Sequence, residues 1–443
     1  MKDIYKSASA ILLFIGLSAN VSANSAPADK KKEDSSEPAL LKISGKAKAT
    51  YHSYQNSKSI REDKGKGTLF AIEDSRLDFK VAGRMDNDWT DRTFFDWTVG
   101  ITGNTGASQN VLENRIRLKG RWGTLLFGNY QGAENFAARG AFTVLGGTGG
   151  IDGNYRNAIK SVTGQLNTTD LAGATKYATK ITYVTPRYSG FQAALTYVPN
   201  SEHKGEGTDG LPVSRNSTKS TKAPFDLNSV ALGINYMNAI TQDLTLSLSA
   251  TGMTAKSRPQ EGGGLVQSNL YKAYATAPLH NTKCYALGGV LAYKSFDFGL
   301  EWMDNGKSRQ VKNAPSVLAP GAAAGANPYV GPLGKFTAGQ AFSIGTAYTY
   351  GKNKVSYGFY TSQRKFNGDN VKVKAHSLSY DRAIAPGFAF FAEGVAFNLK
   401  STNQAAAFQN SLKTNYGSSS GAPSGGIASN KGNSLLLGAA TKF

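Results

Sequence analysis

The sequence has few of the residues that build disulfide frameworks, metal centres or hydrolytic sites. Its 443 residues include one cysteine, Cys284, so no internal disulfide can form. The four histidines, His52, His203, His280 and His376, are dispersed without the spacing of metal ligands. No Gly-x-Ser-x-Gly elbow lies between a predicted strand and a predicted helix, no P-loop occurs, and a hydrolase would still need a Ser–His pair on neighbouring strands. The sequence therefore predicts no metal, no cofactor and no enzymatic activity.

Long apolar segments are also missing. After residue 23 no run approaches the roughly 20 apolar residues of a spanning helix, which excludes a helical inner-membrane protein. A short apolar run at residues 8–17 follows Lys2 and Lys6 and precedes the small-x-small sequence Val21-Ser22-Ala23. This arrangement is typical of a secretory signal peptide, predicted at residues 1–23, and no cysteine follows the cleavage site to make a lipoprotein. Residues 24–38 are expected to form a flexible polar leader, and residues 39–443 a single domain.

The charge balance is strongly basic, with 50 Lys and Arg against 30 Asp and Glu. A net charge of +20 is compatible with solubility or with adhesion to anionic surfaces. An exported chain without a basic helix or zinc-knuckle spacing is not expected to bind nucleic acid. The 50 glycines, 21 tyrosines and 22 phenylalanines, with a negative mean hydropathy, favour β-structure with many turns.

Apolar and polar residues alternate with period two from residue 39 onward. Leu41, Ile43 and Tyr51 share one face of the first segment, and the polar residues, including Lys42 and Lys46, share the other. This alternation predicts strands, because in a helix the lysines would scatter around the axis. It recurs along the chain and is irregular in two places. Residues 371–380 are expected to change register midway, and residues 388–397 are apolar on both sides.

The connections alternate between short turns and long polar loops. Short turns fall near residues 86–88, 122–123, 186–190, 238–242, 295, 351–353 and 382–387. Longer loops fall at 55–67, 131–174, 200–226, 254–282, 305–335 and 400–432. The pattern predicts about sixteen antiparallel strands with short turns at one end and long loops at the other, which is typical of outer-membrane barrels.

The polar faces carry too many charges to pack into a dry core, so the apolar faces form either a sandwich core or a lipid-facing surface. Strand lengths close to a bilayer crossing, aromatic residues near strand ends and the terminal Phe443 on the apolar face favour lipid. The barrel must then close, because an open edge in hydrocarbon leaves backbone groups unpaired. We therefore expect an all-β transmembrane barrel.

Several short segments carry a resemblance to a known family. They are Ile43-Ser44-Gly45-Lys46-Ala47, residues 74–80 (DSRLDFK), residues 114–125 (NRIRLKGRWGTL), residues 181–191 (ITYVTPRYSGF) and Lys442-Phe443. In this order and at these intervals the chain resembles the Gram-negative general porins. The resemblance implies a sixteen-stranded homotrimeric barrel in the outer membrane, in contact with its lipids, and a third external loop folded inward. It further implies that Phe443 in the C-terminal strand is the signal read by the barrel-assembly machinery.

The resemblance also places the residues of the channel. Basic wall residues at the constriction correspond to Lys46, Arg76, Arg115 and Lys176, and alternation alone directs all four to the lumen. The supporting lumen residues Lys42, Lys80, Arg117 and Lys180 share that face. The alternative interpretation of each is a solvated lumen charge without a special role. A ring of charge in a narrow aqueous lumen selects ions by sign, so these residues are the candidate site.

The segment that corresponds to the inward loop departs from the family pattern. Family members carry a Pro-Glu-Phe-Gly-Gly-like stretch, whereas this chain has Thr143-Val144-Leu145-Gly146-Gly147. Its remaining acids, Glu134, Asp152 and Asp170, are the candidates to oppose the basic wall. The sequence thus predicts a diffusion channel for small hydrophilic solutes that prefers anions. A substrate-specific porin for an anionic solute and a surface adhesin that uses its long loops remain the alternatives.

Overall fold

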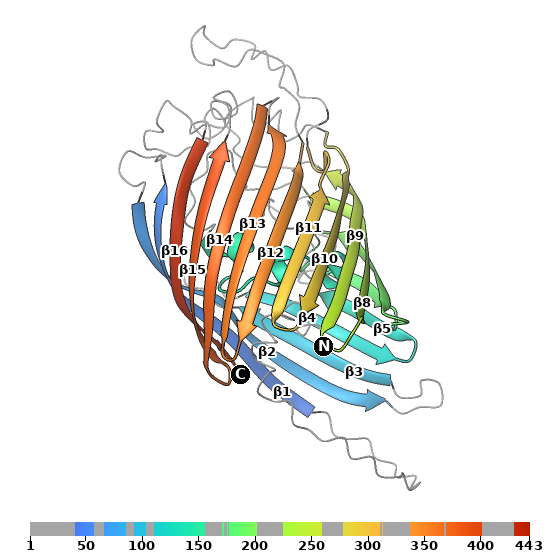
Figure 1. Ribbon diagram of the computed structural model, residues 1–443. Helices are drawn as coiled ribbons and strands as arrows, with labels where there is room; N and C mark the ends of the chain where they lie inside the picture. Colours follow the sequence, from blue (N-terminus) through green and yellow to red (C-terminus); the bar gives the residue numbers. More distant parts are fainter. Residues whose placement is uncertain are drawn as a thin grey trace.

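A computed structural model describes residues 40–56, 66–85, 93–102, 110–155, 171, 175, 177–201, 225–258, 278–310, 312, 337–366, 369–400 and 429–443. The predicted signal peptide and leader lie outside these residues. The chain forms one closed barrel of antiparallel strands in which each strand pairs with its neighbours in sequence and β1 pairs with β16 (Figure 1). The expected number of about sixteen strands is confirmed.

The strands and the short helices of the loop after β5 have the following bounds: β1 Leu40–Asn56, β2 Lys66–Met85, β3 Thr93–Thr102, β4 Asn110–Gly120, β5 Gly123–Asn129, α3 Ala133–Ala137, η1 Ala141–Thr143, η2 Gly150–Asp152, β6 Thr179–Val184, β7 Phe191–Asn200, β8 Phe225–Ala239, β9 Leu244–Arg258, β10 Thr282–Tyr293, β11 Phe296–Asp304, β12 Gln340–Tyr350, β13 Asn353–Phe366, β14 Asp369–Ala385, β15 Phe388–Lys400 and β16 Ser429–Lys442. None of the described helices is long and apolar enough to cross a membrane.

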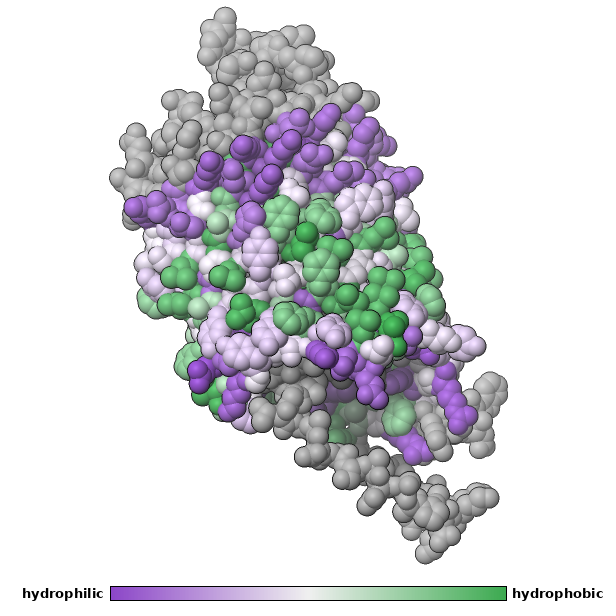
Figure 2. Space-filling model, in the orientation of Figure 1, coloured by the Kyte–Doolittle hydropathy of each residue, from purple (hydrophilic) through white to green (hydrophobic). Residues whose placement is uncertain are grey.

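The predicted apolar faces point outward. Large side chains such as Ile43, Leu195, Leu287 and Leu437 are about half exposed on the outside of the barrel. Figure 2 shows a hydrophobic band across the middle of the visible face of the barrel, with hydrophilic residues above it. Stacked or tilted aromatic pairs lie near the short turns, for example Phe296 with Tyr348 at 4.4 Å between ring centroids. The outer surface therefore matches the apolar zone and aromatic girdle of a membrane barrel.

The inner surface is divided into two halves, which the sequence pattern did not predict. The inner faces of β1 to β4 carry the lysines, arginines and acids that alternation places there. The inner faces of β8 to β16 carry mainly small or apolar side chains that form one buried cluster with the loop after β5. That cluster includes Ala141, Leu145, Ile151, Tyr155, Ala231, Met253, Cys284, Met303, Tyr360, Val373, Val395 and Leu436.

This division explains the two irregular segments. Strand β14 pairs with β13 in one continuous register from Asp369 to Arg382, so the expected register change within residues 371–380 is wrong. Val371 and Val373 point inward and are buried, while lysines near the long loops point outward. The irregularity lies closer to the short turn before β15, between Ala383 and Ala385 where β14 pairs with β15. Strand β15 is apolar on both faces because its inner face also contributes to the buried cluster.

The two ends of the chain close the barrel beside each other. The backbone N–H of Phe443 donates to Gly45 O at 3.0 Å, and the N–H of Gly45 donates to Phe443 O at 3.0 Å. A Cβ at Gly45 would stand 2.6 Å from Cζ of Phe443, so the ring lies over this glycine. Phe443 is 70 % exposed on the outer surface, in agreement with its predicted place on the apolar face.

Candidate pore constriction

Three of the basic residues predicted for the constriction, Lys46, Arg76 and Arg115, lie together on the inner faces of β1 to β4, which we call the charged wall. Its members are Lys42, Lys46, Lys48, Arg76, Asp78, Lys80, Asp96, Glu113, Arg115 and Arg117. Strand register accounts for the gathering: Lys46 lies opposite Arg76, and Lys42 lies opposite Lys80. Sequence alternation placed the basic residues on the correct face, and register decides which of them are neighbours.

The arginines of the charged wall are held by acids of their own strand and of other strands. Arg76 donates from Nε to Asp78 Oδ1 at 2.6 Å and from Nη2 to Glu113 Oε2 at 2.5 Å. Arg115 Nε lies 2.6 Å from Glu113 Oε1, so one carboxylate bridges two arginines. Sequence analysis did not single out Glu113, although its position two residues before Arg115 puts it on the same face.

A second ion-pair group lies nearer the short turns. Arg117 donates from Nε to Asp96 Oδ2 at 2.5 Å, and Lys80 Nζ stands 3.8 Å from the same oxygen. Lys42 and Lys46 are both exposed. The two groups therefore order the arginines, and lysines of β1 present their charge to water.

A glycine makes room for the first ion-pair group, in which Arg76 contacts Asp78 and Glu113. Gly100 of β3 pairs with Asp78 on one side and Glu113 on the other. A Cβ at this position would stand 2.6 Å from Asp78 Oδ1 and 2.8 Å from Arg76 Nη2. The side chains of the two charged residues thus cross over the backbone of β3, which a larger residue at position 100 would prevent.

The loop after β5 folds into the barrel, as the fold prediction requires, and crosses the inner faces of β7 to β15. The Ala133 N–H donates to Thr196 Oγ1 of β7 at 2.8 Å, and the Gly146 N–H donates to Ser356 Oγ of β13 at 2.8 Å. Glycines on the inner faces of the intervening strands let its backbone approach. A Cβ at Gly299 of β11 would stand 2.8 Å from Gly140 O, and one at Gly345 of β12 would stand 2.5 Å from Ala141 O.

The tip of this loop is fixed by two carboxylates of the barrel wall. Glu393 of β15, which is 0 % exposed, accepts hydrogen bonds from the Thr148 N–H at 2.7 Å, the Thr148 hydroxyl at 3.0 Å and the Gly150 N–H at 3.3 Å. Asp381 of β14 accepts the Gly147 N–H at 2.8 Å. Charge-assisted bonds of this kind are stronger than neutral ones, so the two acids hold the tip firmly.

Two lysines supply opposite charge around the loop tip. Lys354 of β13 lies directly opposite Asp381 and is 1 % exposed. Lys48 of β1 donates to Gly147 O at 3.4 Å from the neighbouring side of the barrel. The tip residues Gly146 and Gly147 belong to the stretch that replaces the family's acidic motif. The loop is therefore anchored by acids of the wall that accept its backbone N–H groups.

The base of the loop differs from the sequence prediction. Lys180, expected to line the water-filled lumen, is 3 % exposed and donates to the carbonyls of Tyr130 and Thr175, one at each end of the loop. Glu134, expected as an acid facing the basic wall, is buried and accepts the Thr175 N–H at 3.0 Å and its hydroxyl at 2.8 Å. Both residues are thus parts of the loop anchor, because each satisfies backbone groups that burial removes from water.

Two tyrosines complete the loop base. Burial raises the pKa of the Tyr130 phenol, whose hydroxyl donates to Leu126 O at 2.8 Å. Burial also raises the pKa of Tyr177, and nearby Arg76 acts in the opposite direction. Tyr177 precedes β6, which begins at Thr179, and is hydrogen-bonded to the side chain of Gln131. Tyr177 therefore joins the loop base.

Three predicted site residues remain: Asp152, Lys176 and Asp170. Asp152 lies in η2 and is partly exposed. Lys176 and Asp170 lie outside the described residues. Among the residues that the structure describes, no group of three or more His, Cys, Asp or Glu side chains is arranged to hold a metal ion.

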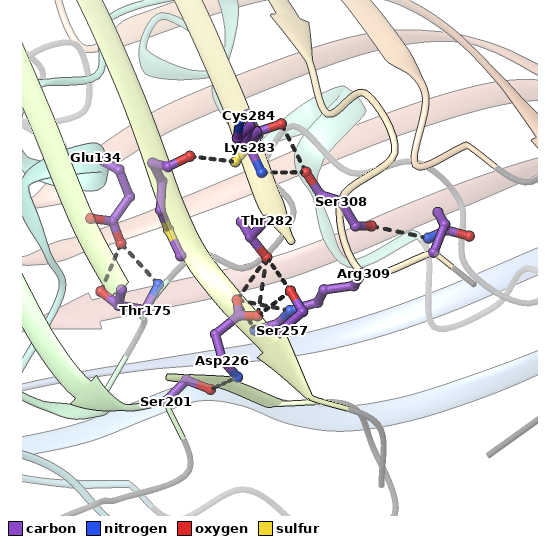
Figure 3. Close-up of polar contacts among 12 residues, drawn as sticks. Glu134, Thr175, Ser201, Asp226, Ser257, Thr282, Lys283, Cys284, Ser308 and Arg309 are labelled. Atoms are coloured by element: carbon purple, nitrogen blue, oxygen red, sulfur yellow. Dashed lines mark hydrogen bonds and ion pairs between the residues drawn. The ribbon is translucent and has the colours of Figure 1, made fainter. Parts of the chain in front are cut away.

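A second polar network lies at the end of the barrel that carries the long loops (Figure 3). Asp226 of β8, which is 0 % exposed, accepts Ser257 Oγ of β9 at 2.7 Å and Thr282 Oγ1 of β10 at 2.9 Å. Arg309 donates to the same carboxylate from Nε at 3.0 Å and from Nη2 at 2.7 Å. The network ties the ends of three strands to the segment after β11 and so fixes the mouth of the barrel.

Similarity to known proteins identifies the family of this chain. The sequence profile described as Gram-negative porin matches residues 8–402. The chain belongs to the Gram-negative porin family. Together with the closed sixteen-stranded barrel, membership identifies an outer-membrane channel fold, as the resemblance predicted.

Relatives and solved structures agree with the porin fold. An uncharacterized protein of Rickettsia typhi is 28 % identical over 298 residues, covering 58 % of this chain and 63 % of the relative. An uncharacterized protein of Rickettsia prowazekii is 27 % identical over 253 residues, covering 51 % of this chain and 52 % of the relative. The porin chain thus spans between half and two thirds of the length of these relatives.

Two solved structures share the barrel. The anion-selective porin from Comamonas acidovorans has a TM-score of 0.54 at 14 % identity and covers 91 % of this chain and 100 % of its own. The trimer form of OmpT, an outer membrane protein of Vibrio cholerae, also has a TM-score of 0.54, at 11 % identity, and covers 92 % of this chain and 100 % of its own. At these identities the likeness shows the fold alone.

Proposed function

We propose that this porin is a general diffusion channel of the bacterial outer membrane, through which small hydrophilic solutes and ions pass without a catalytic step. The observation that carries the proposal is the facing pair of surfaces inside the barrel. The charged wall of β1 to β4 stands on one side, and the inward loop covers the other side. A water-filled gap between a charged surface and a fixed loop restricts solutes by size and by charge.

The channel prefers anions, because the acids and bases of the lumen differ in their access to water. Glu393 and Glu301 are buried beneath the loop at 0 % and 5 % exposure. Lys42 and Lys46 of the opposite wall are exposed, and the acids Asp96 and Glu113 are already paired with arginines. The charge that faces the water is therefore mainly positive, which raises the local concentration of anions. The anion-selective Comamonas acidovorans porin has the same fold.

Planar-bilayer recording of the purified porin tests the proposal. A potassium chloride gradient should give a zero-current potential of the sign that marks anion preference. The variant Lys46→Glu should move this potential toward cation preference, because it reverses an exposed charge on the wall. Lys256→Glu, on the outward face of β9, is the matched control and should leave the potential unchanged. An unmodified channel that prefers cations would overturn the anion proposal.

The same recordings separate the alternatives. Saturable block of the chloride current by inorganic phosphate would favour a channel specific for an anionic solute, since general diffusion does not saturate. An adhesin that uses its loops would lose attachment on deletion of residues 259–277 and keep its conductance. That deletion spares β9, which extends to Arg258, beyond the predicted strand end.

The porin is proposed to assemble as a homotrimer, like the trimer form of OmpT that shares its fold. Small outward residues support a close contact between barrels. Ala49 of β1 and Ala439 of β16 lie in an open groove of about 670 Å³, bordered by Phe70 and Phe390. Electrophoresis of unheated samples should give a trimer that heating dissociates. We also propose that the barrel-assembly machinery recognises Phe443, because this residue is exposed at the end of β16.

A further inference from the structure

Phe142 of the inward loop is the one residue between 141 and 146 that is not buried. Its neighbours in η1, Ala141 and Thr143, are 0 % and 7 % exposed. Ala141 faces the barrel wall, because a Cβ at Gly299 would stand 3.0 Å from Ala141 Cα. The three residues of a 3₁₀ turn point in three directions, so burial of the other two leaves Phe142 on the lumen side of the loop.

Phe142 lies across the barrel from the charged wall. In the closed order of sixteen strands, β12 is opposite β4. The carbonyl of Ala141 lies against Gly345, the central residue of the 11-residue β12, and Arg115 is the central residue of the 11-residue β4. Phe142 and Arg115 therefore lie at about the same level of the channel. A solute that passes the charged wall at this level also passes the phenyl ring.

The lumen side of the loop carries little charge of its own. Its partly exposed residues between 131 and 155 are Gln131, Asn135, Phe136, Ala138, Phe142, Gly147, Thr148, Gly149, Asp152 and Asn154. Asp152 is the single charged residue in this set. Phe136 packs against the buried cluster at the base of the loop, whereas Phe142 stands in the middle of the channel. The loop thus offers an aromatic surface where the opposite wall offers charge.

We propose that Phe142 selects among anions by their apolar part, so that the channel favours small organic anions that carry an aromatic group over equally charged hydrophilic anions. This inference rests on the proposed anion-preferring channel and adds a second criterion to it. The charged wall concentrates anions of every kind, because its field acts on charge alone. Phe142 then retains the anions that carry a ring, because two aromatic rings attract each other beyond the burial of their surfaces.

Block of the chloride current in planar bilayers tests this inference with two probes, benzenesulfonate and methanesulfonate. Both are ionised monoanions at neutral pH, and they differ in the ring. Benzenesulfonate should block the wild-type porin at a concentration roughly three- to tenfold lower than methanesulfonate. Phe142→Ala should remove this difference between the two half-blocking concentrations. Phe142→Tyr keeps an aromatic ring and should retain it.

Two further variants separate the contributions of ring and charge. Phe298→Ala removes an exposed ring from the outer face of β11 and is the matched control, which should leave both half-blocking concentrations unchanged. Lys46→Gln removes an exposed charge from the wall and should raise both concentrations by the same factor, because the two probes carry the same charge.

The outcomes distinguish this inference from the channel proposal. Equal block of the wild type by the two sulfonates would overturn the role of Phe142 and leave the anion preference standing. A difference that Phe142→Ala abolished and Phe142→Tyr did not restore would also overturn it, since the effect would then belong to the position of the loop. A wild-type channel that prefers cations in a potassium chloride gradient would overturn the proposed anion preference and this inference with it.

Discussion

Glu393 is the residue on which the position of the inward loop depends most. Its carboxylate accepts two backbone N–H groups and one hydroxyl from the loop tip, all from residues 148–150. In Glu393→Gln the side chain keeps its size but loses its charge, and one acceptor oxygen becomes a donor that faces other donors. Hydrogen bonds to charged groups contribute about 1.5–3 kcal/mol each, so the loss of one bond and the weakening of the others should cost about 2–4 kcal/mol of docking free energy.

That loss corresponds to a roughly 30- to 1000-fold shift toward an undocked tip. Asp381 and Ser356 still hold Gly147 and Gly146, so the tip should move without release of the whole loop. The expected result in single-channel recordings is added current noise from loop movement and a changed mean conductance, with the barrel intact.

Asp96→Asn is the matched control, because it removes a lumen carboxylate whose ion pairs, with Arg117 and Lys80, lie within the opposite wall. It should shift ion selectivity without adding noise. If Glu393→Gln and Glu393→Ala both gave quiet channels of wild-type conductance, the reasoning that the carboxylate holds the loop would be refuted.

Further predictions concern the loop path, the loop base, the mouth and the closing strand. Gly345→Val should lower the stability of the folded barrel by about 1–3 kcal/mol, measured by thermal unfolding in detergent, because the new side chain meets Ala141 O. Burial raises the pKa of Tyr130 in the folded state above its unfolded value of 10.0. The stability that the protonated phenol contributes is therefore fully present below pH 10 and is lost as the pH rises above 10. Tyr130→Phe should remove this part of the loss of stability at alkaline pH. Asp226→Ala should cost about 2–4 kcal/mol in the same unfolding assay, since three buried or partly buried donors lose their acceptor. Phe443→Ala should slow folding into lipid vesicles, followed by the heat-dependent gel shift, because the ring no longer covers Gly45.

The outer half of this architecture follows directly from the sequence. Alternation placed Ile43, Leu287 and Leu437 on one face, and the structure exposes all three to the outside. The parity of loop lengths predicted the strand number because every second connection must cross back at the same end of a barrel. These features depend on period two and on turn chemistry, both of which are local properties of the chain.

The arrangement of side chains inside the barrel could not be predicted from the sequence in the same way. Alternation cannot distinguish an apolar side chain that faces lipid from one that faces a buried loop, so Val373 and Phe391 made their strands look irregular. Lys180 and Glu134 have the composition of lumen charges, but their partners are backbone groups that become neighbours only in the folded chain. One signal was available: glycines such as Gly299 and Gly345 stand at inward positions of successive strands and mark the track of the loop.

The net charge of the chain is a poor guide to the charge of its channel. Exposed lysines such as Lys372 and Lys400 contribute positive charge on the outer surface, where the barrel wall separates them from solutes in the lumen. Within the lumen, the arginines are balanced by Asp78, Asp96 and Glu113, and the acids of the opposite side are covered by the loop. We therefore expect ion preference to depend on exposed lysines such as Lys46 and on the loop that keeps Glu393 from water. A displaced loop would uncover that carboxylate. Glu393→Ala, which removes the acid, should therefore change current noise and ion selectivity differently from Thr148→Val, which removes a hydroxyl donor and leaves the charge of Glu393 in place.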